Sequence, residues 1–250
     1  MVAHFIVLLG TLKNKKYMQT INVIDNVFLK DGILHAFGRE EEKTMVFLKQ
    51  GDLLGGCAVY SLMMMLIIHK RINLEDLLHK VSSKAPTYIK ELKKRFLLSA
   101  KRRYSLTDLK KKLLLSFNNQ IPVDEFLIRN FNGDEFRKLH LKIKEHLDTG
   151  WPVLISFIPL GVKIGHCVVA VGYTLFGTTL RLFCLDSAFD LQYATIWNNV
   201  IDINMDYDDL YKLDFYYMAN EVVIVKSILL INDQLDLPFE PEDKDSILPF

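Results

Sequence analysis

Residues 50–70 read QGDLLGGCAVYSLMMMLIIHK, and this stretch decides the fold. A Gly-Gly turn delivers one cysteine, Cys57, to the front of a segment that is apolar all round as far as residue 70. A helix without a polar face has to be buried, so residues 57–70 predict a central helix and not a surface one. As the first residue of that helix, Cys57 would meet unpaired backbone N–H groups and the positive end of the dipole, which favour a thiolate.

The composition is that of an ordinary globular protein. The chain has 250 residues, 50% of them hydrophobic and 24% charged, with a formal net charge of +1. This length suits one large domain or two small ones, and the net charge gives no overall attraction to nucleic acid or membrane. The charges are unevenly spread, because basic residues concentrate in residues 70–112 and acidic ones in residues 232–250.

The three cysteines, Cys57, Cys167 and Cys184, have neither a disulfide pattern nor zinc-site spacing. We therefore expect a reducing compartment, no metal and no cofactor. The apolar run near the N-terminus is followed, not preceded, by basic residues, which is unlike a signal peptide. No other apolar run is long enough to span a bilayer, so the sequence predicts a cytoplasmic protein without membrane contact.

The order of predicted elements is helices first and a sheet later. Short strands are expected at residues 2–9, 21–29, 33–37 and 44–49, with a hairpin turn at 30–32. Helices are expected at residues 73–80, 86–98, 106–117 (capped by Ser105 or Thr107) and 134–149. Strands follow at 152–158, 167–173, 180–186 and 221–230, the second and third joined by a hairpin at 176–179.

This order indicates an α+β fold, with a central helix packed on an antiparallel β-sheet. We divide the chain into an N-terminal β-rich extension (residues 1–45), a main domain (46–231) and an acidic C-terminal tail (232–250) that is expected to be extended or disordered.

A histidine and an aspartate are placed to assist Cys57. His166 follows Gly165 and opens the strand CVVAVGY, and Asp186 ends the partner strand LRLFCLD. A hairpin can bring the two together, so that the carboxylate orients the imidazole. The Cys57 N–H and the Gln50 side chain are candidate donors to an oxyanion. A cysteine, a histidine and an aspartate in this order predict thiol catalysis.

These segments resemble the papain-like cysteine peptidases, and among them the C39-like branch known from bacteriocin-processing transporters and free-standing bacterial proteins. Residues 50–70 resemble the family's nucleophile segment, and GWPVLISF, GHCVVAVGY and LFCLDS resemble its second half. The resemblance implies a papain-like fold and hydrolysis of a peptide bond through a thioester. It also implies Cys57 as nucleophile, His166 as general base and acid, Asp186 as its orienter and Gln50 as oxyanion donor.

Several alternatives stay open. A lone cysteine before an apolar helix is more often a packing residue, and the same triad serves amidases, deamidases and transglutaminases. Gln50 lies one residue further from the cysteine than the family's glutamine, which leaves room for a peptide-binding module without catalysis.

Other polar residues near the predicted site have structural interpretations. Neighbours on a strand point to opposite faces, so Cys167 and also Cys184 are expected to be structural core residues. Asp190 is a spare acid close to Asp186. The basic region at 70–112 is either a solvated helix face, which we favour, or a surface for an acidic partner or nucleic acid.

Overall fold

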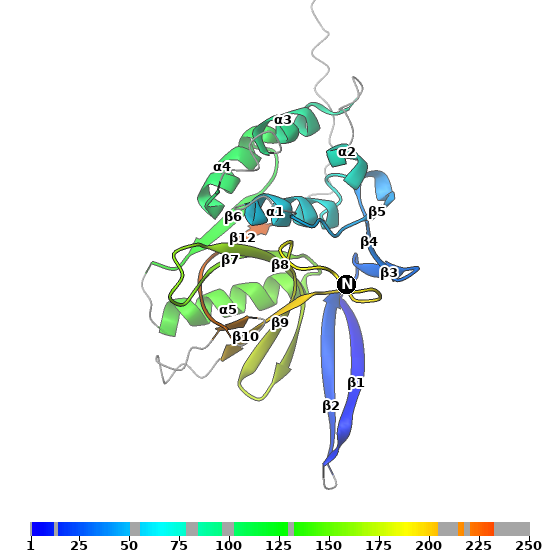
Figure 1. Ribbon diagram of the computed structural model, residues 1–250, viewed down its shortest axis with the longest axis vertical. Helices are drawn as coiled ribbons and strands as arrows, with labels where there is room; N and C mark the ends of the chain where they lie inside the picture. The colour runs from blue at the N-terminus through cyan, green and yellow to red at the C-terminus, as the bar shows by residue number, and fades with distance from the viewer. Residues whose placement is uncertain are drawn as a thin grey trace, which may run out of the picture.

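The computed structural model describes residues 2–12, 15–50, 56–78, 85–96, 103–129, 133–204, 215–217 and 221–232 (Figure 1). Its helices are α1 (Cys57–Ile68), α2 (Leu74–Leu78), α3 (Thr87–Phe96), α4 (Leu106–Ser116) and α5 (Gly133–Asp148), with a 3-10 turn at Arg39–Glu41. Its strands are β1 (Val2–Leu12), β2 (Lys15–Ile24), β3 (Phe28–Lys30), β4 (Ile33–Phe37), β5 (Lys43–Met45), β6 (Val123–Leu127), β7 (Val153–Pro159), β8 (His166–Phe176), β9 (Thr179–Leu185), β10 (Asn199–Asn204), β11 (Phe215–Tyr217) and β12 (Glu221–Ile231). The molecule is therefore a mixed α+β protein, as its sequence predicts.

Strand β8 is the centre of the sheet. Within the described residues, nine strands form one antiparallel sheet, and β8 pairs with β2, β7 and β9. From β8 the pairings run through β7, β12, β11, β10 and β9 and return to β8, so this part of the sheet closes on itself. Strand β6 adds to β12, and β3, β4 and β5 form a small separate sheet.

Helix α1 is buried along its whole length, which confirms the prediction from its apolar sequence. Of its twelve residues only Tyr60 is not buried, and the helix packs on β8 and β7. In Figure 1, α1 lies above these two strands and α5 lies below them. Consecutive residues of β7, Val153 to Ile155, are fully buried, as expected of a strand covered on both faces.

Side chains from neighbouring elements fix the ends of the helices. At the end of α1, the Asn26 amide donates to the carbonyl oxygens of Ile68 (2.6 Å) and Phe37 (3.0 Å). Ser105 caps α4, because its hydroxyl accepts from the Asp108 N–H while the Asp108 carboxylate accepts from the Ser105 N–H. Ser105, and not Thr107, is therefore the N-cap.

Some predicted boundaries are wrong. The single strand expected at residues 21–29 is two strands, because the chain turns at Asp25-Asn26 and the Asn26 side chain is used to hold α1. The strand expected at 44–49 is only Lys43–Met45. The prediction also missed β6, β10 and β11, which are short strands completed by pairing with distant segments.

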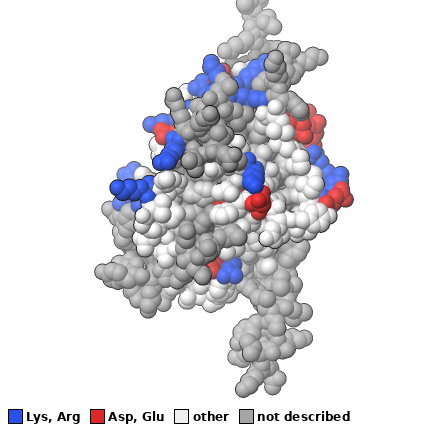
Figure 2. Space-filling view, viewed as in Figure 1, with Lys and Arg blue, Asp and Glu red and all other residues white. Residues whose placement is uncertain are grey.

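The basic helices α3 and α4 bury their apolar residues and turn their lysines outward. Tyr88, Ile89, Leu92 and Phe96 of α3 are buried, as are Leu106, Leu109 and Leu113 of α4. Figure 2 shows the Lys and Arg side chains over these helices at the upper part of the molecule. This is the arrangement of a solvated helix face.

Two sequence predictions concern other parts of the chain. The acidic tail, from residue 233 onward, lies outside the described residues. None of the helices in the described part of the chain combines the length and hydropathy needed to cross a membrane.

The contact between β2 and β8 depends on a glycine. A Cβ atom on Gly172 would lie 2.4 Å from the Asn22 carbonyl oxygen and 3.0 Å from the Val23 Cα, both of them backbone atoms of β2. We expect Gly172→Ala to force the strands apart and to lower the free energy of unfolding by about 1–3 kcal/mol. For a domain of this size that lowers Tm by about 2–4 °C per kcal/mol, measurable by circular dichroism.

Gly165→Ala is the matched control, because its Cβ would approach nothing closer than the Phe157 carbonyl oxygen at 3.5 Å. We expect it to keep the wild-type Tm. Equal Tm values for the two variants would show that the close approach at Gly172 is unimportant.

Candidate active site

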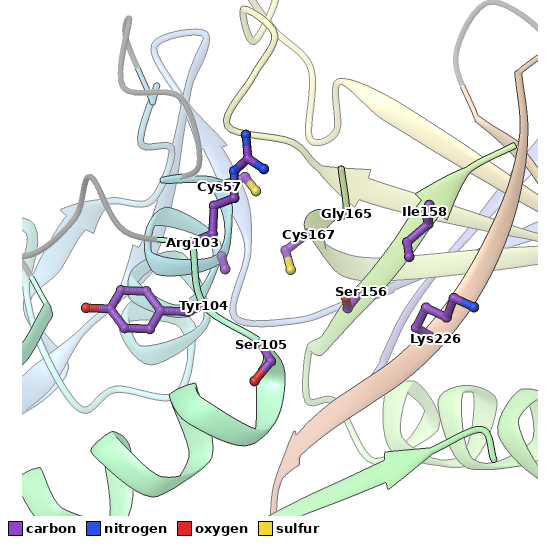
Figure 3. A pocket seen from close by; sticks show the side chains of 10 residues that line it. Cys57, Arg103, Tyr104, Ser105, Ser156, Ile158, Gly165, Cys167 and Lys226 are labelled. Atoms are coloured by element: carbon purple, nitrogen blue, oxygen red, sulfur yellow. The ribbon is translucent and has the colours of Figure 1, made fainter. Parts of the chain in front are cut away.

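Cys57 is the first residue of α1 and lines a pocket. Gly56 caps the helix, and its carbonyl accepts from the N–H groups of Val59 (2.9 Å) and Tyr60 (3.0 Å). As a first-turn residue, Cys57 has no intrahelical acceptor for its own N–H. The residue is 7% exposed, and the pocket beside it has a volume of about 230 Å³ (Figure 3). Gly55, the first glycine of the predicted Gly-Gly turn, lies outside the described residues.

His166 and Asp186 meet through the pairing of β8 with β9. His166 begins β8, Asp186 directly follows β9, and the two strands pair as far as Val169 and Leu185. The His166 Nε2 donates to Asp186 Oδ1 at 2.8 Å. Since Asp186 takes Nε2, Nδ1 is the ring nitrogen left to exchange a proton with Cys57.

The Asp186 carboxylate is fully buried and accepts hydrogen bonds from His166, Ala188 and Asn199. Besides His166, the Ala188 N–H donates to Oδ1 at 2.8 Å and the Asn199 side-chain amide donates to Oδ2 at 2.9 Å. Asn198 holds the backbone of the same residue, because its side chain accepts from the Asp186 N–H (2.7 Å) and donates to the Asp186 carbonyl (2.8 Å). The carboxylate is therefore fixed in place as an acceptor for the imidazole.

The two asparagines were missed from the sequence. Asn198 directly precedes β10, and Asn199 is the first residue of that strand, NVIDIN. An adjacent polar pair at the start of a half-buried strand was the available signal, but nothing in the local sequence points to Asp186 as its partner.

Two neighbours stabilise the Cys57 thiolate. The largest effect on the pKa of Cys57 is a hydrogen bond with the Cys167 thiol, which lowers it. Burial raises this pKa, whereas the hydrogen bond with His166 and the charge of His166 lower it further. Together they lower the pKa of Cys57 from 9.0 to about 4. Above that pH, Cys57 is a thiolate at the end of a helix, where the dipole also favours negative charge.

His166 holds its proton for the complementary reason. Burial disfavours the charged imidazole, but hydrogen bonds and charges from Asp186 and Cys57 outweigh burial and raise the pKa of His166 from 6.5 to about 10. Between roughly pH 4 and pH 10, Cys57 and His166 therefore form a thiolate–imidazolium pair. This pair is the reactive form of a cysteine–histidine nucleophile.

The expectation for Cys167 needs correction. The residue is buried, as predicted, but its thiol is hydrogen-bonded to Cys57. This hydrogen bond, burial and the negative charge of Cys57 raise the pKa of Cys167 well above its ordinary value. It lines the same pocket as Cys57, opposite Ser156 of β7. Alternation along the strand failed as a guide because α1 packs directly on β8, and its first residue contacts both His166 and Cys167. Cys184 is a core residue, as expected.

Gln50 and Asp190 lie on the Asp186 side of the site. The Gln50 N–H donates to the Ser187 carbonyl at 2.8 Å, and its side-chain oxygen accepts from the Ser187 hydroxyl at 3.3 Å. Gln50 is thus held next to the triad acid and is not among the residues lining the pocket beside Cys57. The spare acid Asp190 is exposed and pairs with Lys49 at 2.5 Å.

No protein-family model matches this chain, and no curated protein matches its sequence. Within the part of the chain that the structure describes, no three His, Cys, Asp or Glu side chains are grouped so that they could hold a metal ion.

The lowered pKa of Cys57 predicts an unusual pH profile of alkylation. An ordinary thiol with a pKa of 9.0 loses about tenfold in rate for each pH unit below that value, because only the thiolate reacts. We expect iodoacetamide to modify Cys57 at a nearly constant rate from pH 5 to pH 8, as followed by peptide mass spectrometry. The buried Cys184, whose pKa is raised, should stay unmodified in the folded protein. A tenfold fall per unit at Cys57 would contradict the thiolate assignment.

Removing the charge of Asp186 tests the other half of the pair. Asp186→Asn removes the carboxylate that raises the pKa of His166, so that pKa should fall from about 10 toward or below neutrality. An NMR titration of the His166 ring measures it directly. Asp190→Asn is the matched control, because Asp190 pairs with Lys49 instead, and it should leave the His166 titration unchanged. Equal His166 pKa values in the two variants would show that Asp186 does not act on His166.

Proposed function

We propose that this protein is a papain-like cysteine peptidase that hydrolyses a peptide bond through a thioester intermediate. The observation that carries the proposal is the hydrogen-bonded series Cys57, His166 and Asp186, with the cysteine at the start of a buried helix and the histidine at the start of a strand. The same series would equally serve another amide substrate, so the bond that is broken has to be tested directly.

In the proposed mechanism the Cys57 thiolate attacks the carbonyl carbon of the scissile bond. The Cys57 N–H, free of an intrahelical acceptor, donates to the developing oxyanion. The His166 imidazolium then gives its Nδ1 proton to the leaving amine, and the thioester forms as the C–N bond breaks. In the second half, the neutral imidazole takes a proton from water, which attacks the thioester and releases Cys57.

Asp186 acts in this scheme without exchanging a proton itself. Its hydrogen bond to Nε2 fixes the ring so that Nδ1 is directed at Cys57, and its charge stabilises the imidazolium. Asn199 and Ala188 position the carboxylate. They are positioning groups and do not touch the reacting atoms.

We also propose a reducing location such as the cytoplasm. The three cysteines are free, and the thiols of Cys57 and Cys167 are in contact. A nucleophile that stays a thiolate beside a second thiol is best preserved where thiols are kept reduced.

The proposed activity is tested with a mixed peptide library read by mass spectrometry. We expect new peptide termini with the wild-type protein and a loss of at least about 10³-fold in rate with Cys57→Ala. Cys184→Ala is the matched control, a cysteine of the core away from the pocket, and should keep cleaving. Cleavage by Cys57→Ala at the wild-type rate would refute the mechanism.

The same reactions distinguish the alternatives. Release of ammonia, or transfer to an added amine, without new termini would assign the triad to deamidation or transglutamination. If the protein binds peptides but no reaction depends on Cys57, the protein is a peptide-binding module and not an enzyme.

A further inference from the structure

The pocket beside Cys57 carries two cationic side chains from separate walls. Arg103 lies just before α4, and Lys226 belongs to β12; both line the pocket together with Cys57. In Figure 3, Arg103 and Cys57 lie on one side of the pocket and Lys226 on the other, with Cys167 and Ser156 between them. None of the described residues that line the pocket is acidic.

Lys226 reaches the pocket because of a β-bulge. Strand β12 pairs with β7 at Val225–Phe157 and next at Ser227–Ser156. Lys226 is therefore an extra residue in the register, opposite no residue of β7. Bulges beside active sites redirect a side chain that regular pairing would place elsewhere. The Lys226 carbonyl accepts from the Ile128 N–H at 3.0 Å, which fixes the bulge from its other side.

Arg103 is exposed, but the two residues that follow it, Tyr104 and Ser105, are held in place by contacts with α3 and α4. Ser105 is the N-cap of α4, in a reciprocal hydrogen bond with Asp108. The Tyr104 ring lies under the Lys112 ammonium at 4.8 Å and edge-on to Phe96. The wall that carries Arg103 is therefore defined by α3 and α4.

These cations are not needed to ionise the nucleophile. The groups that lower the pKa of Cys57 are Cys167 and His166, and the thiolate is already matched by the imidazolium. Arg103 and Lys226 therefore add two cationic side chains to the pocket beside that pair. The Ser156 hydroxyl adds a hydrogen-bond donor to the same space.

We propose that this pocket binds a carboxylate of the substrate, next to the bond that Cys57 attacks. The inference rests on the proposed peptidase function and adds the substrate class to it: peptides with an acidic side chain, or with the chain's own C-terminal carboxylate, beside the scissile bond. Arg103 and Lys226 are the specificity-determining residues. A carboxylate held between a guanidinium and an ammonium gains charge-assisted hydrogen bonds that a neutral side chain cannot make.

Two alkylating reagents test the charge of the pocket without any peptide. Iodoacetate carries a carboxylate and iodoacetamide is its neutral counterpart, and both modify a thiolate. The quantity measured is the ratio of their rates at Cys57, so that a change in thiol reactivity common to both reagents cancels. We expect Arg103→Gln and Lys226→Gln each to lower this ratio by about threefold to tenfold, as expected from removing one partly solvated charge near the reagent.

The matched control is Lys138→Gln, an exposed lysine of α5 that does not line the pocket. It should keep the wild-type ratio. His166 attracts iodoacetate in every variant, so only the difference between variants reports on Arg103 and Lys226. In about 1 M salt, where charges are screened beyond about 3 Å, the wild-type ratio should approach that of the two variants.

Peptides then separate the two sources of the carboxylate. One pair places Glu or Gln beside the cleavage site in C-terminally amidated peptides, and a second pair compares a free with an amidated C-terminus. We expect kcat/KM to favour the acidic member of at least one pair, and Lys226→Gln or Arg103→Gln to reduce that preference.

The outcomes distinguish the two proposals. If Cys57 reacts with neither reagent, the proposed function fails. If Cys57 reacts rapidly but the ratio is the same in wild type, Arg103→Gln and Lys226→Gln, the function stands and the carboxylate pocket is refuted.

Discussion

The buried carboxylate of Asp186 is the constraint on which the site depends. A carboxylate with no exposed surface is stable only if hydrogen bonds replace its water, and here they come from His166, Ala188 and Asn199. These three donors belong to the start of β8, the turn after β9 and the start of β10. One charged group therefore ties three strands together at the end of the sheet where α1 begins.

The orientation of the imidazole follows from that arrangement, and the state of the cysteine follows from the imidazole. With Nε2 used by Asp186, His166 keeps its proton and meets Cys57 as a cation. The thiolate then needs little from the rest of the protein, because Cys167 already donates to it. The stability of the buried charge and the reactivity of the thiol are thus two consequences of the same hydrogen bonds.

The sequence predicted the features that depend on local pattern. The apolar run after Cys57 predicts a buried helix, and the Phe176–Thr179 turn predicts the hairpin that brings His166 to Asp186. Features that depend on distant partners were missed: β10 is completed by β9 and β11, and Asn199 has a role only once Asp186 lies beside it. The bulge at Lys226 also could not be predicted from the sequence, because a bulge is defined by how β12 pairs with β7, a strand far away in the chain.

The complete burial of α1 has a consequence for how such a protein can diversify. Nearly every residue of this helix faces the core, so few positions on it can change without disturbing the packing beneath the nucleophile. The pocket walls are different, because Arg103 precedes a helix at the surface and Lys226 stands outside the regular pairing of its sheet. Relatives of this protein could exchange these two residues and acquire new substrates while the thiolate and its imidazolium stay as they are.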